Sequence, residues 1–588
     1  MSAYLPPLDD IKFCIRHLAN IEGTLTLDAF EGIEVDDLEQ VLDEAGKFAA
    51  DVIAPTNVAG DQQGCSVEGG SVRVPAPFAD IHAQFVENGW QSVAGNPEYE
   101  GMGLPKTIAF AVAEMCQTAN LAYSLMPMLT RDAANALEEH GNDELKAKYL
   151  SKIVTGEWAG TMILTEPQAG SDLGAITSTA VPDGDAYRIS GTKIYITWGD
   201  HELSENIIHF VLARIEGAVE GIRGLSLFLV PKFMVNDDGS LGERNDFVCT
   251  SVEHKLGIHG SPTCVLNFGD NGGAVGYLVG DEGKGINAMF TMMNNARMEV
   301  GLQGVAVSER AYQLARTYAL DRVQGRVAGK EGRAPIIHHA DVRRMLMLMR
   351  AQIEAMRALA YAAAAQDDVV YSGSGDAQVA ADRRLNLLTP VVKTWCTENS
   401  QEVTSLGIQI HGGMGFVEET GATQHYRDAR ILTIYEGTSG IQAGDFTGRK
   451  VLGDEGRELR SLLDELRTAA ADMQGTDALA DIGTAVSEGL DLVSQGMDWL
   501  LANAGDDPQA PGAASFNFVM LAGCVLSGAF LAQAAAAAHA AGGTYGSEKV
   551  ATAAFYCAHV LPRAHAYMSS MTADPAITMA IPADAFAD

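Results

Sequence analysis

The sequence predicts an α+β fold in which a helical domain, an antiparallel β domain and a helical bundle are followed by an additional helical domain. Apolar residues recur at helical spacing up to about residue 157, alternate within 161–281, and return to helical spacing after residue 285. A chain of 588 residues also exceeds the length over which one hydrophobic core keeps growing. We therefore expect an N-terminal extension at 1–35, the three domains at 36–160, 161–281 and 282–450, and the additional helical domain at 451–588.

The helical domain and the helical bundle are both predicted from apolar spacing. In the first, helical runs cover residues 37–52 and 107–119. In the second, residues three and four positions apart form one apolar stripe that needs neighbouring helices, namely Leu346, Met349, Ile353, Met356 and Ala360. Two long helices are expected after Pro335 and Pro390, because proline suits the first turn of a helix.

The β domain is predicted from two-residue alternation and from turn chemistry. Apolar side chains alternate through Tyr187, Ile189, Ile194 and Ile196. Turns are expected at 182–185 and at Ser190-Gly191, where Pro, Asp, Ser and Gly gather. Further strands are expected at 207–215, 225–230 and 264–268.

The additional helical domain contains one stretch that resembles a membrane span. Residues 518–538 are almost wholly apolar and, at roughly 20 residues, long enough to cross a bilayer. Alanine dominates the stretch, and no Lys or Arg between Arg467 and Lys549 sets an orientation. We therefore expect a buried bundle helix and no stable membrane insertion. Residues 505–512, rich in Gly, Pro and Asp, are expected to form a loop.

The composition excludes several classes of function. A formal net charge of −36 opposes binding to nucleic acid or anionic lipid, which both need clustered Lys and Arg. The eight cysteines contain no Cys-x-x-Cys pair, so we expect neither a metal site nor a disulfide framework. The first residues lack the basic and apolar regions of an export signal, so a cytoplasmic protein is expected.

Glu436 is the most informative single residue, in the run Ile434-Tyr435-Glu436-Gly437-Thr438. A carboxylate flanked by apolar side chains loses hydration and becomes a stronger base, and Gly437 lets a ligand approach the backbone closely. This environment suits the removal of a proton from carbon. Taken alone, the pentapeptide is equally typical of a solvated turn.

Three further motifs precede Glu436 in the chain. They are Met162-Ile163-Leu164-Thr165-Glu166-Pro167 leading to Ala169-Gly170-Ser171-Asp172, then Gly191-Thr192-Lys193-Ile194-Tyr195-Ile196-Thr197, and then Gln409-Ile410-His411-Gly412-Gly413-Met414-Gly415-Phe416. In this order and together with the Glu436 motif, they resemble the acyl-CoA dehydrogenase family over residues 36–450. The large subgroup with an added C-terminal helical domain is most similar. The resemblance implies the acyl-CoA dehydrogenase fold.

The resemblance also implies a reaction, the FAD-dependent α,β-dehydrogenation of an acyl-CoA thioester to the trans-2-enoyl-CoA. Such a reaction needs a hydride acceptor, which is N5 of FAD, and a base for the α proton. By resemblance the base is Glu436, with its backbone amide polarising the thioester carbonyl. Some relatives carry the base at the position of Ala296, which cannot accept a proton here. Glu299 is expected to point to another helix face.

Binding residues follow from the same resemblance. FAD contacts are expected from Met162, Leu164, Thr165, Tyr195, Thr197, Arg322, Gln324, Gln409, Gly413 and Thr438. Substrate contacts are expected from Ser171, Asn294, Arg297 and Gly437. In the family a neighbouring subunit completes the FAD site, so we expect a homodimer or a dimer of dimers. The alternative for Arg297 is an ordinary ion pair on a helix surface.

Five residues depart from the family pattern at positions that bear on binding. Tyr195 stands where tryptophan is frequent, Asn294 where an acidic residue is frequent, Gln324-Gly325 where Thr-Phe is usual, and Gly440 where many relatives have Gln. The adenosine end of FAD and the hydrogen bonds to the acyl-CoA are therefore expected to differ.

The sequence does not specify the electron acceptor or the acyl group of the substrate. Electron-transfer flavoprotein is the expected acceptor, but an acyl-CoA oxidase would use the same base and flavin. A DNA-binding relative is disfavoured because the additional domain is acidic. The acyl group is either a medium or long fatty chain or a short chain with a thioether sulfur. Four methionines would suit a thioether but are also typical core residues, namely Met289, Met292, Met293 and Met298.

Overall fold

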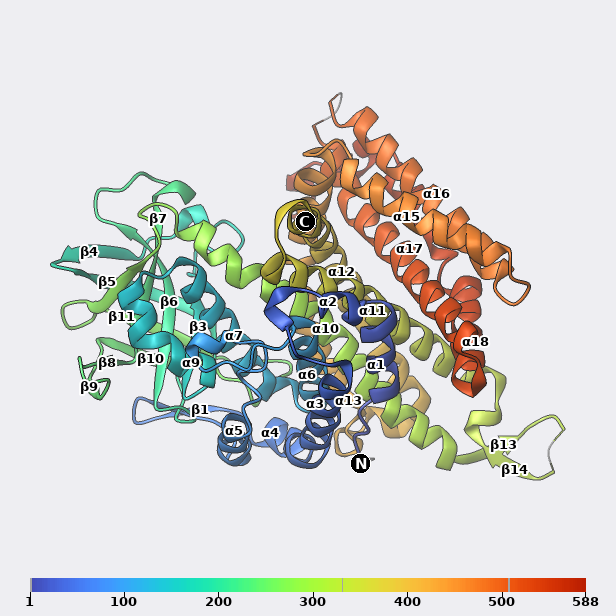
Figure 1. Ribbon diagram of the computed structural model, residues 1–588, viewed down its shortest axis with the longest axis horizontal. Coiled ribbons are helices and arrows are strands. Elements are labelled where there is room, and N and C mark those ends of the chain that lie inside the picture. The colour runs from blue at the N-terminus through green and yellow to red at the C-terminus, as the bar shows by residue number, and fades with distance from the viewer. Residues whose placement is uncertain (1–2, 330, 506–507, 588) are drawn as a thin grey trace. The chain divides into compact units, whose positions relative to one another are not determined.

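The structure is a computed structural model that describes residues 3–329, 331–505 and 508–587. The chain divides into two compact units, one made of residues 40–299 and the other of residues 1–39 with 300–588. The unit of residues 40–299 combines helices with a large β-sheet, whereas the other is almost entirely helical (Figure 1). Two helices continue across the divisions in the sequence, α3 (Val35–Phe48) and α10 (Gly285–Asp321).

The helices of the unit of residues 40–299 include the two predicted runs. They are the end of α3 with a π-helical continuation (Ala49–Ile53), α4 (Asn57–Gln63), α5 (Pro77–Glu87), α6 (Lys106–Ala119), α7 (Leu121–His140), α8 (Asp143–Leu145) and α9 (Ser151–Thr155). The helices predicted at 37–52 and 107–119 are therefore confirmed. Asn120 separates α6 from α7 and caps α7, because its side-chain oxygen accepts a hydrogen bond from the Tyr123 amide.

The large sheet of the described chain has eight strands, in the order β10-β11-β5-β12-β7-β6-β3, with β4 paired to β5 and β6. They are β3 (Trp158–Ile163), β4 (Thr179–Asp183), β5 (Ala186–Thr197), β6 (Asn206–Ile215), β7 (Leu225–Pro231), β10 (Phe247–Val252), β11 (Thr263–Phe268) and β12 (Ala274–Val279). β6 runs parallel to β3 and β4, and the remaining pairings are antiparallel. The strands predicted after residue 206 are confirmed as β6, β7 and β11.

Apolar side chains at alternate strand positions form the core of this sheet. Ile163, Ile189, Val211 and Phe228 are all fully buried in it. Two short antiparallel pairs belong to the same unit, β1 (Ser66–Glu68) with β2 (Ser71–Arg73) and β8 (Phe233–Val235) with β9 (Leu241–Arg244).

The turn predicted at Ser190-Gly191 is wrong, because β5 runs through both residues. Residues 187–189 pair with β12 and residues 191–197 pair with β11, so the strand changes partner at this point. Gly191 has φ +145°, and a Cβ there would lie 2.2 Å from the Ser178 Oγ atom. Gly191 therefore allows a continuous strand to bend at a point where the Ser178 side chain lies close to the strand backbone.

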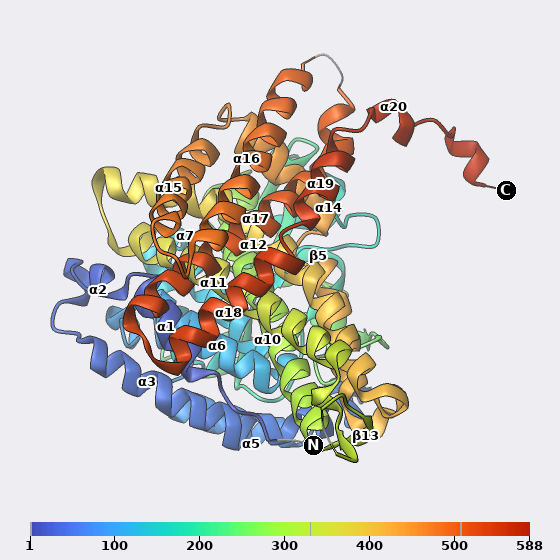
Figure 2. The same cartoon turned by 90° about the vertical axis from the view of Figure 1, so that its right-hand side faces the viewer.

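The second unit begins with α1 (Leu8–His17) and α2 (Ile21–Thr24) and continues from Val300 in α10. Its bundle contains α11 (Ala340–Ser372), α12 (Gly375–His411), α13 (Ala422–Ala429), α14 (Ser439–Gly444) and a π-helical segment (Asp445–Leu452). The additional domain contains α15 (Arg457–Gln474), α16 (Ala480–Asn503), α17 (Ala510–Ala541), α18 (Gly543–His559), α19 (Arg563–Met571) and α20 (Pro575–Thr578). Figure 2 shows α20 and the last residues running clear of α19. A hairpin of β13 (Val323–Arg326) and β14 (Arg333–Pro335) between α10 and α11 was not predicted.

Two predictions for the bundle have different outcomes. The apolar stripe of α11 is confirmed, because all five of its residues are buried. The helix expected to begin near Pro390 begins instead at Gly375, and Pro390 lies inside α12. Residues on both sides of Pro390 are buried in the bundle, so tertiary packing overrides the local preference of proline for a helix start.

α17 is the buried helix that the sequence predicts at 518–538. By length and composition it could cross a membrane, but 94% of its most apolar 18-residue window is buried inside the protein. The loop predicted at 505–512 ends earlier than expected, because α17 begins at Ala510. Its residues 506 and 507 lie outside the described residues.

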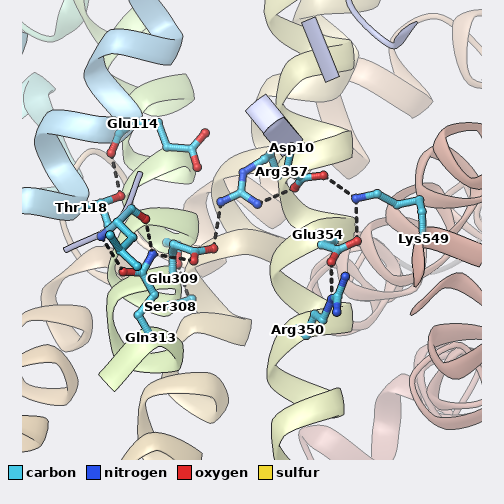
Figure 3. A network of polar contacts seen from close by, with 12 residues as sticks. Asp10, Glu114, Thr118, Ser308, Glu309, Gln313, Arg350, Glu354, Arg357 and Lys549 are labelled. Atoms are coloured by element: carbon cyan, nitrogen blue, oxygen red, sulfur yellow. Dashed lines mark hydrogen bonds and ion pairs between the residues drawn. The ribbon is translucent and has the colours of Figure 1, made fainter. Parts of the chain in front are cut away.

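A buried ionic network joins the N-terminal helix to the bundle and to the additional domain (Figure 3). Arg357 of α11 lies 2.7 Å from Asp10 of α1 and 3.0 Å from Glu309 of α10. Lys549 of α18 contacts Asp10 and lies 2.6 Å from Glu354 of α11. Four helices from widely separated parts of the sequence are therefore connected by paired charges.

Candidate active site

Glu436 lies in a short turn between a 3₁₀ helix (Arg430–Thr433) and α14. Its backbone has φ +54°, and Gly437 follows with φ +88°. The left-handed conformation is unfavourable for a residue with a Cβ, so surrounding contacts must hold it. Glycine adopts this conformation without strain, whereas a Cβ on Gly437 would lie 2.6 Å from the Gln442 Nε2 atom and would displace that amide.

Two buried polar side chains bind the main chain of this turn. The Lys393 ammonium, on α12, donates to the Gly437 carbonyl at 2.8 Å. The Gln442 amide, on α14, donates to the Glu436 carbonyl at 3.1 Å. Lys393 and Gln442 are both fully buried. The carbonyls of both residues with positive φ are therefore held by side chains from α12 and α14.

Tyr435 supplies a further contact through its hydroxyl, which donates to the Oε1 atom of Gln303 on α10. Burial raises the pKa of Tyr435 well above its ordinary value, and the nearby negative charges of Glu436 and Asp428 raise it further. The phenol therefore stays protonated at neutral pH and keeps donating. Glu436 itself is half-buried, so its carboxylate has lost part of its hydration.

In the unit of residues 40–299, two predicted flavin-binding segments lie side by side. β3 ends at Ile163, and the Thr165 carbonyl then accepts a hydrogen bond from the Ile194 amide of β5 at 2.9 Å. The Lys193 ammonium donates to the Leu164 carbonyl, also at 2.9 Å. The structure therefore brings residues 162–165 next to residues 193–197.

Glu166 and Lys193 form a fully buried ion pair at 2.9 Å. Glu166 also accepts hydrogen bonds from the backbone amides and hydroxyls of Thr177 and Ser178. Although burial alone would raise it, Lys193 and these donors hold the pKa of Glu166 at about 2. Burial lowers the pKa of Lys193 to about 8, and Glu166 limits that fall. Both groups are therefore charged at neutral pH and fix the loop that follows β3.

Tyr195 is an exposed aromatic residue at a β-bulge. Ile194 and Tyr195 of β5 together oppose Val265 of β11, and Tyr195 has φ +59°. Its side chain is 61% exposed, which is unusual for a large aromatic residue on a strand. A strained backbone that presents an aromatic ring outward is typical of a ligand-binding position.

The other predicted residues of this unit differ in exposure. Met162 is buried on β3, whereas Leu164, Thr165 and Thr197 are half-buried. Ser171 is exposed, in the loop that Glu166 braces. Polar hydroxyls and the Tyr195 ring therefore gather around the ends of β3 and β5.

In the other unit, the residues expected at the FAD diphosphate are largely exposed. Arg322 and Gln324 lie at the base of the β13–β14 hairpin, and Arg322 has no ion pair among the described residues. Gln409 lies exposed in the last turn of α12. A Cβ on Gly413 would meet no described atom within 4 Å, so the fold itself does not require glycine there. The Thr438 hydroxyl accepts from the Ile441 amide and caps α14.

On α10, Arg297 is buried and donates to the Asn294 side-chain oxygen at 3.3 Å. Arg297 therefore does not lie on an exposed face of the helix. Glu299 lies elsewhere on the helix and forms a pair with Arg131 at 2.7 Å. Gln117 donates to the same carboxylate. The Glu299 carboxylate is thus already bound by Arg131 and Gln117. Ala296 is fully buried, and its methyl side chain cannot accept a proton.

Sequence reasoning missed the residues that hold the site in place. Glu166 and Lys193 were recognised only as parts of motifs, although two opposite charges within two otherwise apolar motifs are a signal for a buried pair. Lys393 and Gln442 gave no such signal, because the carbonyls of the turn that they bind are present at every residue. Trp198, with φ +54°, was also missed, and its indole N–H donates to the Ala122 carbonyl at 3.1 Å.

Comparison with known proteins identifies similar chains over almost the whole length. Family models match in order, as the acyl-CoA dehydrogenase N-terminal domain at 35–157, the middle domain at 161–271, the C-terminal domain at 283–449, and the acetyl-CoA dehydrogenase C-terminal-like domain at 456–582.

Individual relatives agree with these matches. A 3-methylmercaptopropionyl-CoA dehydrogenase of Ruegeria pomeroyi is 47% identical, covering 97% of this chain and 98% of the relative. A broad-specificity linear acyl-CoA dehydrogenase of Mycobacterium tuberculosis is 36% identical over 96% of each chain. The solved structure of an acyl-CoA dehydrogenase complexed with FAD from Bacillus anthracis has the same fold, with a TM-score of 0.76, 22% identity, and coverage of 93% of this chain and 90% of that one.

Proposed function

The chain belongs to the acyl-CoA dehydrogenase family, and on that premise we propose how its residues carry out FAD-dependent α,β-dehydrogenation of an acyl-CoA thioester. The observation that carries the proposal is the turn of Glu436, a carboxylate on a strained backbone held by buried polar side chains. Strain of this kind persists where function requires a fixed geometry.

The residues of this chain fit FAD. Backbone groups of Leu164 and Thr165 and the hydroxyls of Thr165 and Thr197 supply the donors and acceptors that a flavin ring edge needs. The exposed Tyr195 ring supplies an apolar surface for a flat aromatic group. FAD, when bound, accepts the β hydride at N5.

Glu436 is the proposed base for the α proton. The family's alternative position is Ala296, which has no acidic group. Glu299 is paired with Arg131 and Gln117, so proton transfer by Glu299 would break a buried ionic contact. Arg297, Asn294, Ser171 and Gly437 are proposed to bind the acyl-CoA.

The proposed substrate is 3-methylmercaptopropionyl-CoA, which would place the chain in the catabolism of dimethylsulfoniopropionate. The support is the 47% identity to the relative named for that substrate. A medium- or long-chain fatty acyl-CoA is the second candidate, favoured by the relative of broad linear specificity. Met289 and Met292 are fully buried, which favours their role as core residues over contact with a thioether.

The proposed assembly is a cytoplasmic homodimer or dimer of dimers that passes electrons to electron-transfer flavoprotein. Exposed Arg322 without an ion pair in the described chain, exposed Gln409, and a Gly413 that the fold itself does not require support a diphosphate site completed by a second subunit. Nucleic acid and stable membrane insertion are not part of the proposal.

Replacing Glu436 with Gln tests the base directly. Glu436→Gln keeps the shape but cannot accept a proton, so bleaching of bound FAD by substrate should slow by roughly a thousandfold. FAD content, read from the visible absorbance, should equal that of the wild type. Glu419→Gln, which changes an exposed carboxylate on the surface, is the control and should bleach normally. Near-full bleaching by FAD-loaded Glu436→Gln would exclude Glu436 as the base.

The electron acceptor and substrate can be separated in the same assay. Turnover that needs electron-transfer flavoprotein or an artificial dye supports the dehydrogenase, whereas rapid hydrogen peroxide formation without either supports an oxidase. A panel of acyl-CoA thioesters that differ in length and in a γ sulfur distinguishes the two substrate classes.

A further inference from the structure

The turn that carries Glu436 is strained at two consecutive residues, since Glu436 and Gly437 both have positive φ. Gly437 adopts such a backbone at little cost, but Glu436 does not. A turn of this kind relaxes to a different path unless other groups hold each peptide plane. The side chains that bind its carbonyls are therefore the groups that decide where the Glu436 carboxylate lies.

Lys393 and Gln442 bind these carbonyls from two different helices. Lys393 belongs to α12 and donates to the Gly437 carbonyl, 44 residues away in the sequence, at 2.8 Å. Gln442 belongs to α14 and donates to the Glu436 carbonyl at 3.1 Å. The peptide planes on both sides of Gly437 are therefore each fixed by one hydrogen bond.

Burial makes both contacts rigid. Lys393 and Gln442 are 0% exposed, so bulk water does not compete with the two carbonyls for these donors. A Cβ on Gly437 would lie 2.6 Å from Gln442 Nε2, so the amide is packed directly against the turn. With both carbonyls held, the Glu436 side chain keeps only its own torsions.

We propose that Lys393 and Gln442 are positioning residues for Glu436, which hold its backbone in the left-handed conformation so that the carboxylate meets the substrate α carbon. This inference rests on the proposed role of Glu436 as the base. Neither residue is proposed to touch the substrate or FAD. Their loss should therefore slow proton abstraction while leaving binding of both molecules largely intact, because misplacing a catalytic group affects the chemical step.

The test uses FAD-loaded protein and two single variants, Lys393→Met and Gln442→Met. Each removes one donor to the turn and keeps a side chain of similar length. The substrate-induced bleaching rate at saturation should fall by roughly 10- to 100-fold, and the substrate concentration for half-maximal rate should change less than about threefold. FAD content should stay at the wild-type value.

Matched controls separate positioning from general destabilisation. Lys549→Met removes a buried lysine of the ionic network, and Gln352→Met removes a buried glutamine that donates to the Leu348 carbonyl within α11. Both controls lower thermal stability, but their bleaching rates should stay within about twofold of the wild type because they do not contact the turn.

The results distinguish an error in the proposed function from an error in the proposed positioning role. If Glu436→Gln bleaches normally, the proposed function fails. If Glu436→Gln is inactive while Lys393→Met and Gln442→Met bleach no more slowly than their controls, Glu436 remains the base and the positioning role is overturned. Should Lys393→Met fail to fold, Gln442→Met decides alone, because it removes a single neutral hydrogen bond.

Discussion

A buried ammonium needs several acceptors, and Lys193 has three, the Leu164 and Leu212 carbonyls and the Glu166 carboxylate. Glu166 in turn accepts from the two residues that follow the loop, Thr177 and Ser178. A mutually satisfied pair of this kind is costly to break, since removal of one partner leaves the other charge buried. At the scale of single residues, this pair fixes the segment expected to meet the flavin.

The Glu166 pKa gives a prediction for stability against pH. The pKa is about 2 in the folded protein and 4.5 in the reference state, so the group contributes stability above pH 4.5 and loses it as the pH falls towards 2. The shift corresponds to about 3 kcal/mol at neutral pH. Glu166→Gln should therefore be less stable than the wild type by at least this amount at pH 7, with a difference roughly half as large at pH 3.

Urea unfolding at the two pH values measures this difference. Glu419→Gln, which changes an exposed carboxylate, is the control and should show no comparable change with pH. A difference between wild type and Glu166→Gln that is the same at pH 7 and pH 3 would contradict the assigned pKa.

At the scale of elements, β5 illustrates how a single strand can serve two partners. Its first residues pair with β12 and its last residues with β11, and the change occurs at Gly191. Beyond this bend, the bulge at Tyr195 turns the aromatic ring outward. The strand therefore has two irregularities. The bend at Gly191 lets it pair with two different strands, and the bulge at Tyr195 exposes the aromatic ring at the candidate site.

Gly191→Ala tests the first irregularity. The new Cβ would lie 2.2 Å from Ser178 Oγ and on a backbone with φ +145°, so the free energy of unfolding should fall by about 2–4 kcal/mol. Gly170→Ala is the control, because a Cβ there meets no described atom within 4 Å and φ is not positive. Equal urea midpoints for the two variants would show that Ser178 moves away at no cost.

The sequence predicts elements best where one local pattern dominates. The apolar run of β6 and the apolar stripe of α11 are such cases. The motifs identified Glu436 and the segments that we propose to bind the flavin. It predicts poorly where a distant part of the chain decides the conformation. Pro390 inside α12 and Gly191 inside β5 both follow local rules for a boundary, but tertiary packing continues the element through them.

The same reason explains why the supports of the site could not be predicted. Lys393 and Gln442 bind backbone carbonyls, and any polar residue could do so in a different fold. The unpredicted β13–β14 hairpin contains Arg322 and Gln324, whose exposure depends on the pairing of two short segments separated by a loop. Only the folded chain specifies such contacts.

At the scale of the whole molecule, the ionic network joins the two ends of the polypeptide within one unit. Asp10 contacts Arg357, Lys549 and the Tyr545 hydroxyl, and these cations lower its pKa against the opposing effect of burial. The pKa of Lys549 is raised by Asp10 and Glu354. Charges in this network are therefore mutually dependent.

Because these charges depend on one another, the effects of two substitutions in the network on the free energy of unfolding should not add. Lys549→Met should lower the free energy of unfolding by about 3–5 kcal/mol, because it leaves Asp10 and Glu354 buried with less compensation. Asp10→Asn with Lys549→Met should cost less than the sum of the single changes by about 1–3 kcal/mol. Urea unfolding of the two single variants and the double variant measures this coupling, and strict additivity would contradict a direct contact.

This network also has a consequence for synthesis on the ribosome. Asp10 leaves the exit tunnel early, whereas Lys549 lies 539 residues further along. A nascent chain must therefore carry its first helix without the final counter-ion until translation is nearly complete. A premature stop codon before α18 would release a product whose amino-terminal helix lacks that anchor, and such loosely held ends are the places where cellular proteases begin.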